Sequence, residues 1–172
     1  MEINTNRLYI RNLRESDWTE MKHIFSDFNR SKYAIYDAAL PITDTEVKKL
    51  TKRFAETNLF FAVFLKEAPH MAGYVCFHKD KDAYDLGYCF HSAYQGKGFA
   101  FESCEALMLG FKEQYGARVF TAGTAINNIP SCKLLKKLGF VCVSTETLSF
   151  HKDSVGNDIL FEGGNFVCRI ME

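Results

Sequence analysis

Residues 95–100 are Gln-Gly-Lys-Gly-Phe-Ala and lie between a strand-like run and a long amphipathic pattern. The start of a helix has unpaired N–H groups, and these favour an anion together with the helix dipole. Glycine at 96 and 98 lets the backbone come close to a bulky anionic group, and Lys97 adds a positive charge. We interpret this hexapeptide as a candidate pyrophosphate cradle. It is a weak signal alone, because glycines also form ordinary turns.

Two common phosphate-binding loops do not match this segment. A Walker loop needs GxxxxGK followed by Ser or Thr, and a dinucleotide-binding loop needs a third glycine in GxGxxG. The segment also lies in the middle of the chain, at residues 95–100 of 172. If it binds a phosphate group, it does so in a different structural context.

The segments on either side of the cradle have the periodicities of a strand–helix–strand unit. The runs at 84–90 and 118–124 are strand-like, and between them apolar residues recur every three or four positions. The predicted helix covers 99–115, and Gly116 suits its C-terminal cap. Its expected buried face consists of Ala100, Cys104, Leu107, Met108, Phe111 and Tyr115. Such crossovers usually make the two strands parallel.

The rest of the chain continues this mixed pattern. We predict the order β-α-α-β-β-β-α-β-α-β-β, which defines a single mixed α/β domain over 1–172. Ser16 is the expected N-cap of a helix that ends at Phe28, and Thr43 to Glu46 form a capping box for the next helix. Segment 29–42 has no clear period and is predicted to be a loop or an irregular helix. The other elements are expected at 7–13, 59–65, 71–78, 127–139, 140–150 and 165–171.

Composition and charge argue against several classes of protein. The 172 residues carry a formal net charge of zero, so broad attraction to nucleic acid or to an anionic membrane is not supported. No apolar run approaches the roughly 18 residues of a membrane span. The N-terminus lacks the profile of a signal peptide. We expect a soluble, cytoplasmic protein without nucleic-acid or membrane partners.

Six cysteines stand in apolar runs, at positions 76, 89, 104, 132, 142 and 168. None forms a CxxC pair and no histidine pair has zinc spacing, so no metal site is expected. Free cysteine in an apolar run behaves as a small hydrophobic residue. Buried thiols in a reducing compartment are therefore favoured over disulfides. The pattern leaves an isolated catalytic cysteine open, although no Cys–His spacing points to one.

Several motifs resemble the GNAT superfamily of acyl-CoA-dependent N-acyltransferases. Residues 95–100 match its Q/R-x-x-G-x-G/A motif. The longer stretch at 85–102 resembles the ribosomal-protein N-terminal acetyltransferase-like branch of that family. Residues 127–140 resemble the branch's N-x-x-S-x-x-(L/V)-x-x-K-L-G-F helix, and 6–18 resemble its first strand and helix. The motifs follow one another in the family's order over nearly the whole chain.

The resemblance implies a fold and a site for acetyl-CoA. The implied fold is a strongly twisted mixed sheet flanked by helices, in which two central parallel strands splay apart into a V. The pantetheine arm of acetyl-CoA enters that gap and pairs with the free strand edge like an added strand. The implied contacts are the edge residues Cys89, Phe90 and His91, the loop residues Gln95, Gly96, Lys97, Gly98, Phe99 and Ala100, and Asn128 on the other side of the arm.

Direct transfer of acetyl to an amine needs a proton acceptor, a donor to the oxyanion and a donor to the departing thiolate. By the resemblance, Ser131 is the donor to the thiolate and also contacts the cosubstrate, and a backbone N–H near Phe90 is the oxyanion donor. Asp85 stands where the branch commonly has Glu and is our candidate base. Glu146 is the nearest candidate in the later strands. No covalent acyl-enzyme is needed, so no nucleophile–base pair is expected.

Each of these side chains has an alternative role in the fold. Asn128 and Ser131 can satisfy N–H groups at a helix start, and Asp85 can be a solvated carboxylate. His78 and His91 are expected to be residues at strand ends rather than bases. The irregular segment carries three further residues, which by the resemblance cover the acceptor site and otherwise pack in the core: Tyr33, Tyr36 and Asp37.

The sequence therefore predicts an N-acetyltransferase that moves acetyl from acetyl-CoA to a primary amine, either of a protein N-terminus or of a small molecule. Two alternatives come from other classes. One is a non-catalytic acyl-CoA-binding sensor that keeps the cradle without acid–base groups. The other is a nucleotide-binding module of a different fold. Homodimers are common in the family that the chain resembles.

Overall fold

The computed structural model describes residues 1–68 and 70–170. One eight-stranded sheet in this part of the chain has the order β1-β2-β3-β4-β5-β6-β8-β7. Its strands are β1 (Glu2–Asn4), β2 (Leu8–Asn12), β3 (Phe60–Leu65), β4 (Met71–Asp80), β5 (Ala83–Phe90), β6 (Val119–Ala125), β7 (Val141–Leu148) and β8 (Phe161–Arg169). Strands β5 and β6 pair in parallel, as predicted, and the other neighbours are antiparallel. The mixed α/β prediction is confirmed, with the short strand β1 in addition.

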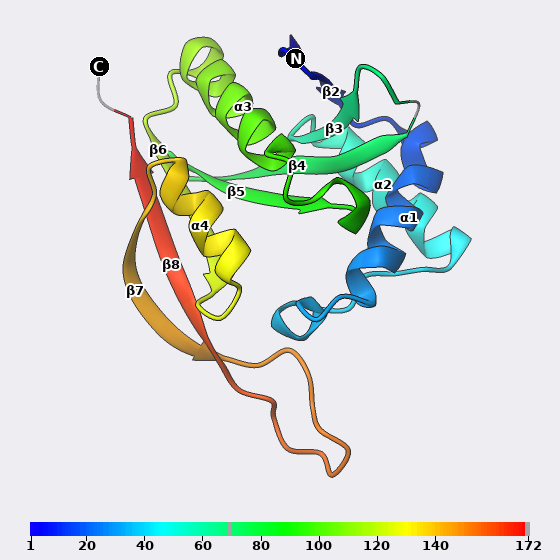
Figure 1. Cartoon of the computed structure of the whole chain (residues 1–172), viewed down its shortest axis with the longest axis vertical. Helices are drawn as coiled ribbons and strands as arrows, with labels where there is room; N and C mark the ends of the chain where they lie inside the picture. Colours follow the sequence, from blue (N-terminus) through cyan, green and yellow to red (C-terminus); the bar gives the residue numbers. More distant parts are fainter. Residues whose placement is uncertain (69, 171–172) are drawn as a thin grey trace.

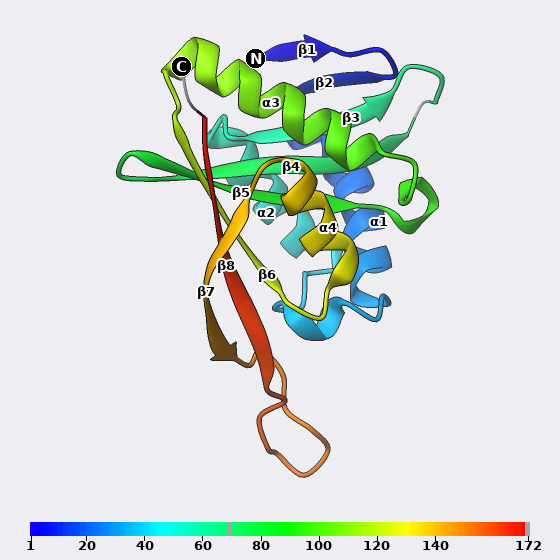
Figure 2. The same cartoon turned by 60° about the vertical axis from the view of Figure 1, so that its left-hand side comes forward.

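Two helical layers cover the two faces of the sheet (Figures 1 and 2). The helices are α1 (Trp18–Asn29), α2 (Asp44–Glu56), α3 (Phe99–Tyr115) and α4 (Ile129–Lys137), with 3-10 turns η1 (Glu15–Asp17), η2 (Ala34–Tyr36) and η3 (Ser92–Tyr94). Helices α1 and α2 share one apolar core with β3 and β4, and α3 and α4 share a larger one on the opposite face. The irregular segment after α1 contains η2, as predicted. No helix among the described residues is both long and apolar enough to cross a membrane.

The helix starts agree with the prediction at α2 but not at α1. The Thr43 hydroxyl accepts the N–H of Glu46 and donates to its carboxylate, so the predicted capping box is present. Ser16 is not the N-cap of α1, because it lies inside η1 and Asp17 precedes the helix. The Asp17 carboxylate is bound by the guanidinium of Arg11 through two contacts of 2.8 Å. This ion pair holds η1 in front of the helix.

Helix α3 buries the predicted face with two exceptions. Cys104, Leu107, Met108 and Phe111 are buried, whereas Tyr115 is 51% exposed. Tyr115 is the last residue of the helix, and its ring packs against Phe111 at the helix end, with 5.1 Å between ring centroids. Ala100 is half-buried because it borders the cleft described below. The C-cap prediction is confirmed, since Gly116 has a left-handed φ of +67°.

All six cysteines are free thiols, but the burial prediction is only partly correct. Cys89 and Cys132 are half-buried and Cys142 is exposed. Cys142 lies on β7, one of the two edge strands of the sheet, where all residues but the last are exposed. Burial raises the pKa of Cys76 and of Cys89 to about 12, so neither thiol is a nucleophile at neutral pH. No group of three or more His, Cys, Asp or Glu residues in the described ranges could hold a metal ion.

Candidate functional site

The parallel strands β5 and β6 separate soon after they meet. Their ladder joins residues 83–85 to residues 119–121 and goes no further. Strand β5 continues to Phe90 in pairing with β4 on its other edge, and β6 continues to Ala125 in pairing with β8. The predicted V-shaped splay is therefore confirmed. A cleft of about 800 Å³ lies along it.

Both faces of the sheet contribute to this cleft, because successive residues of β5 point to opposite faces. Cys89 packs with the core beneath α1, whereas Tyr88 and Phe90 pack with the core beneath α3. The lining joins the glycine loop and α4 on the α3 face to the segment from α1 to η2 on the α1 face. We call these two parts the α3-side and the α1-side of the cleft.

Gly96 and Gly98 lie in the left-handed region of backbone space, with φ of +72° and +82°. Side chains are strained in that conformation, so the loop favours glycine at both positions. A Cβ added at Gly96 would have no neighbouring atom within 4 Å, whereas one at Gly98 would lie 3.3 Å from the guanidinium of Arg7. The loop residues that line the cleft are Gln95, Gly96, Gly98, Phe99 and Ala100. The backbone at the start of α3 is thus open to the cleft.

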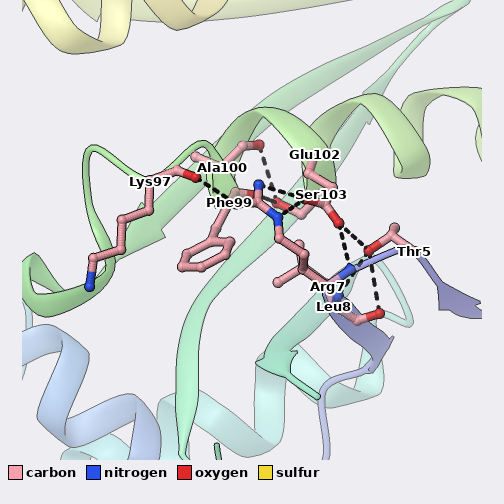
Figure 3. A network of polar contacts seen from close by, with 8 residues as sticks. All are labelled: Thr5, Arg7, Leu8, Lys97, Phe99, Ala100, Glu102 and Ser103. Atoms are coloured by element: carbon pink, nitrogen blue, oxygen red, sulfur yellow. Dashed lines mark hydrogen bonds and ion pairs between the residues drawn. The ribbon is translucent and has the colours of Figure 1, made fainter. Parts of the chain in front are cut away.

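A polar network connects this loop to the N-terminal strand region (Figure 3). The Glu102 carboxylate accepts the Thr5 hydroxyl at 2.6 Å, the backbone N–H of Arg7 at 3.0 Å and the Nε of Arg7 at 2.7 Å. The same guanidinium donates to the carbonyl of Lys97 at 2.9 Å and lies 4.5 Å from the centre of the Phe99 ring. The sequence carries no signal for this network, because Arg7 and Glu102 are 95 residues apart.

We expect Glu102→Gln to lower the free energy of unfolding by about 2 kcal/mol at pH 7, because hydrogen bonds to a charged group are lost. Desolvation, the largest influence, raises the pKa of Glu102, but hydrogen bonds from Thr5 and Arg7 together lower it below its ordinary value. The carboxylate's contribution is therefore complete above about pH 4.3 and is lost as the pH falls through the lowered value. Urea unfolding at pH 7 and at acid pH measures both effects.

The control for this prediction is Glu105→Gln, on an exposed residue of the same helix. It removes the same charge without touching the network, and it should change the free energy of unfolding by less than about 0.5 kcal/mol. Equal destabilisation by both variants at pH 7 would contradict a specific role for Glu102.

Two residues expected at the cosubstrate site do not line the cleft, namely Lys97 and His91. The Lys97 Nζ donates to the carbonyl of Ala93 at 2.9 Å. The His91 Nδ1 accepts the N–H of Ala93 at 3.2 Å and so caps η3, while its Nε2 lies 3.7 Å from the Asp27 carboxylate. The short turn η3 binds both side chains through its own backbone. The sequence pattern does not show this, because it marks residue types and not their local hydrogen bonds.

The strand edge that faces the splay offers fewer polar groups than expected. The N–H of His91 donates to the carbonyl of Ala72 on β4 at 3.0 Å. Successive N–H groups of a strand alternate in direction, so the N–H of Cys89 also points to β4 and that of Phe90 points into the splay. The carbonyl of Phe90 accepts the Nε2 of Gln95 at 2.7 Å. Of the three predicted edge residues, Phe90 alone presents its N–H to the cleft.

Helix α4 contributes the other wall of the α3-side. The Asn128 side chain accepts the N–H of Ser131 at 3.4 Å, which confirms the capping role. The Ser131 hydroxyl lies 2.8 Å from the hydroxyl of Tyr88 on β5. Two cations that were not predicted also line this wall, Lys133 and Lys137. The lysines at 133, 136 and 137 are a signal in the sequence that could have indicated this basic wall, but their orientation toward the cleft depends on how the helix packs.

The α1-side contains the residues expected around an acceptor. Three of them come from the segment before α2, namely Tyr33, Tyr36 and Asp37. Tyr74, on β4, is buried next to them, and desolvation raises its pKa well above the ordinary value. Asp85 accepts the hydroxyl of Thr121 at 2.8 Å and lies opposite His78 across the β4–β5 ladder; both line the cleft. This side therefore combines carboxylates with phenol hydroxyls.

The loop between β7 and β8 binds this segment from outside the cleft. The Nε2 of His151 lies 2.7 Å from the carbonyl of Asp37 and 3.1 Å from that of Ala34. The ring of Phe161 packs against Tyr36 with 5.2 Å between centroids. Glu146, the other candidate base, does not line the cleft; its exposed carboxylate accepts the side-chain amide of Asn165 at 3.1 Å.

Residues 7–141 match the family model described as "Acetyltransferase (GNAT) domain". This match spans well over half of the chain, so the chain belongs to the GNAT acetyltransferase family and is an acetyltransferase. The geometry above has the features of that family, with a splay between parallel strands and a glycine loop at a helix start. The alternative of a nucleotide-binding module with a different fold is excluded.

Individual proteins agree with this family assignment. The Bacillus subtilis (strain 168) protein named "Uncharacterized N-acetyltransferase YnaD" is 32% identical over 143 residues, which cover 81% of this chain and 82% of that protein. A GNAT-family acetyltransferase structure from Bacillus anthracis aligns with a TM-score of 0.81 at 22% identity, over 98% of both chains. RimL, a ribosomal L7/L12 α-N-protein acetyltransferase solved with coenzyme A, aligns with a TM-score of 0.81 at 16% identity, over 99% of this chain and 98% of that chain. At these identities the two structures support the fold alone.

Proposed function

We propose that this acetyltransferase moves the acetyl group of acetyl-CoA directly to a primary amine, either of a protein N-terminus or of a small molecule. The observation that carries the proposal is one cleft that joins the open glycine loop of α3 to the splay between β5 and β6. The α3-side suits a long anionic cosubstrate, and the α1-side leaves room for an acceptor. RimL is named as an α-N-protein acetyltransferase of ribosomal L7/L12, which favours a protein N-terminus among the amines.

Acetyl-CoA would bind on the α3-side. The amides at 96–100 suit its pyrophosphate, because a helix start with open backbone favours an anion. The N–H of Phe90 faces the splay and suits a carbonyl of the pantetheine arm or of the thioester. The Asn128 oxygen already accepts the N–H of Ser131, so its amide nitrogen is the atom available to the arm. Lys133 and Lys137 add positive charge to the wall opposite the loop.

The transfer would use groups from both sides of the cleft. Asp85 on the α1-side accepts the proton that the amine loses, the N–H of Phe90 stabilises the oxyanion, and Ser131 donates a hydrogen bond to the thiolate. The amine nitrogen bonds to the thioester carbon, the carbon–sulfur bond breaks, and its electron pair stays on sulfur. The chain forms no covalent intermediate, because the attacking nitrogen belongs to the acceptor.

The test is acetyl transfer by the purified protein from acetyl-CoA to a panel of primary amines. The panel contains peptides with free N-termini, an alkylamine, a polyamine and an amino sugar, and release of the CoA thiol is followed by a thiol reagent. Peptides with a blocked N-terminus and no lysine are the matched negative control. We expect turnover with at least one amine, and mass spectrometry should find the acetyl group on nitrogen.

Two other outcomes would contradict the proposal. Binding of acetyl-CoA with no turnover across the panel would favour the non-catalytic acyl-CoA-binding sensor. Turnover with no binding preference for acetyl-CoA over acetate esters would place the acyl donor in another chemical class.

His151→Ala is expected to raise the KM for the acceptor about fivefold, because the contact that holds the carbonyls of Ala34 and Asp37 is lost. The Kd for acetyl-CoA should not change, since the α3-side is untouched. Steady-state kinetics and isothermal titration measure the two quantities. The control is His23→Ala, on an exposed residue of α1. An unchanged acceptor KM in a folded His151 variant would show that the loop contact does not shape the acceptor site.

A further inference from the structure

One hydrogen bond crosses the α3-side of the cleft from the sheet to α4. The hydroxyl of Tyr88 on β5 lies 2.8 Å from the hydroxyl of Ser131 in the first turn of α4. Both residues line the cleft, and Tyr88 packs against the core beneath α3. The bond therefore joins two elements that border the splay, next to the proposed cosubstrate site.

The direction of this bond follows from the acidities of the two hydroxyls. A phenol is a stronger acid than an alkyl alcohol and so is the better donor, which makes the Ser131 oxygen the acceptor. Desolvation raises the pKa of Tyr88 well above its ordinary value, so the phenol keeps its proton at neutral pH. The serine proton is then directed away from the phenol.

The serine proton also has no carbonyl of the helix to bind. Ser103 in α3 donates to the carbonyl of Phe99 at 2.8 Å, as helical serines often do. Ser131 makes no comparable bond to a backbone carbonyl within the described chain. The carbonyl of Asn128, three residues earlier, already accepts the N–H of Cys132 at 3.0 Å. Its O–H is therefore available to a group in the cleft.

We propose that Tyr88 is a positioning residue of the acetyl transfer, which turns the Ser131 hydroxyl toward the departing CoA sulfur. This inference rests on the proposed function. As the carbon–nitrogen bond forms and the carbon–sulfur bond breaks, the electron pair moves to sulfur, and the Ser131 O–H donates a hydrogen bond to that thiolate. The proton lost by the amine goes to the base, and Tyr88 keeps its own proton throughout.

A double-mutant cycle on kcat tests this role. We expect Tyr88→Phe to lower kcat about tenfold with little change in the KM for acetyl-CoA. Ser131→Ala should lower kcat further, and the double variant should be no slower than Ser131→Ala alone, because one residue acts through the other. The control is Tyr84→Phe, four residues earlier on the same strand, buried in the same core and outside the cleft lining. It should keep the parent kcat.

A second measurement needs no acceptor, so it separates this inference from the proposed function. The pKa of the thiol of bound CoA is read from thiolate absorbance as a function of pH. A donor aimed at sulfur lowers that pKa, and we expect Tyr88→Phe and Ser131→Ala each to raise it relative to the parent. The inference would be overturned if the thiol pKa of bound CoA in Tyr88→Phe equalled that in the parent. It would also be overturned if the double variant lost kcat by the product of the two single losses, because the residues would then act independently. Absence of turnover by the parent would overturn the proposed function while this titration still decides the role of Tyr88.

Discussion

The substitution Gly96→Glu is expected to weaken acetyl-CoA binding by about 100-fold or more. Gly96 lines the cleft, and a Cβ there would meet no atom within 4 Å, so the new carboxylate has room to stand beside the pyrophosphate. Like charges placed together in a binding site cost several kcal/mol, and about 2.7 kcal/mol already corresponds to a factor of 100. Isothermal titration with acetyl-CoA measures the loss, and circular dichroism confirms that the variant is folded.

The matched control is Gly116→Glu, at the C-terminal end of α3, the helix that follows the glycine loop. Gly116 has a φ of +67°, close to the +72° of Gly96, and an added Cβ there would also have no neighbour within 4 Å. The control therefore carries the same charge and a similar backbone strain, and it should bind acetyl-CoA as the parent does. Gly98 is less suitable, because a new side chain there would lie against the Arg7 guanidinium and disturb its pairing with Glu102.

The comparison of these variants separates charge from strain. If Gly96→Glu and Gly116→Glu weakened acetyl-CoA binding equally, the loss would come from backbone strain and not from the charge. Unchanged binding by a folded Gly96→Glu variant would contradict a pyrophosphate site at the glycine loop. Gly96→Ala adds the strain without the charge, and we expect it to bind more tightly than Gly96→Glu. That order of affinities is the specific signature of an anion at this loop.

The parts of the site that follow from local patterns could be predicted from the sequence. The glycine pair, the 3.6-residue period of 99–115 and the Gly116 cap each depend on neighbouring residues, and together they define the crossover that makes β5 and β6 parallel. The Thr43–Glu46 capping box is local in the same sense. The family motifs then placed these elements in one fold, including the splay that periodicity alone does not reveal.

The parts that depend on contacts between distant segments could not be predicted. The ion pair of Arg7 with Glu102 and the bond of His151 to the η2 segment join residues that are far apart in the chain. The sequence marked Lys97 as a cation for the cradle, but its ammonium group binds the carbonyl of Ala93 in its own turn. Hydrogen bonding within a short turn competes with the site for such a side chain, and residue type does not indicate which one prevails.

The alternation of residues along a strand shows which residues of the motif face the cleft, which the motif alone does not. Cys89, Phe90 and His91 are consecutive, so a linear pattern treats them as one edge. Their N–H groups alternate in direction, and the bond from His91 to Ala72 fixes which of them faces β4. The same alternation places Asp85 and Tyr88 on opposite faces of the sheet. Because Ser131 lies against Tyr88, the candidate base Asp85 and the candidate thiolate donor Ser131 also lie on opposite faces. Direct transfer suits this separation, since the amine nitrogen bonds to the reacting carbon on one side and the thiolate leaves that carbon on another.

The substitution Asp85→Asn should reveal whether this carboxylate accepts the amine's proton. Asp85 lies in the last paired position of β5 with β6, at the base of the splay, and its carboxylate accepts the Thr121 hydroxyl at 2.8 Å. An alkylamine with a pKa of about 10.4 is only about 0.04% free base at pH 7, so loss of the base matters most for such an acceptor. We expect kcat for an alkylamine at pH 7 to fall about 100-fold, with the Kd for acetyl-CoA unchanged.

The pH dependence distinguishes a lost base from a disturbed structure. Without the carboxylate, the rate should follow the fraction of free amine and rise about tenfold per pH unit toward the pKa of the acceptor. An α-amine with a pKa of about 8 should suffer a smaller loss at pH 7, because more of it is already free. The control is Asp82→Asn, on an exposed residue just before β5, which should keep the parent profile. If the rate of Asp85→Asn stayed low at high pH, Asp85 would not be the base. The next candidate to test would then be His78, its partner across the β4–β5 ladder.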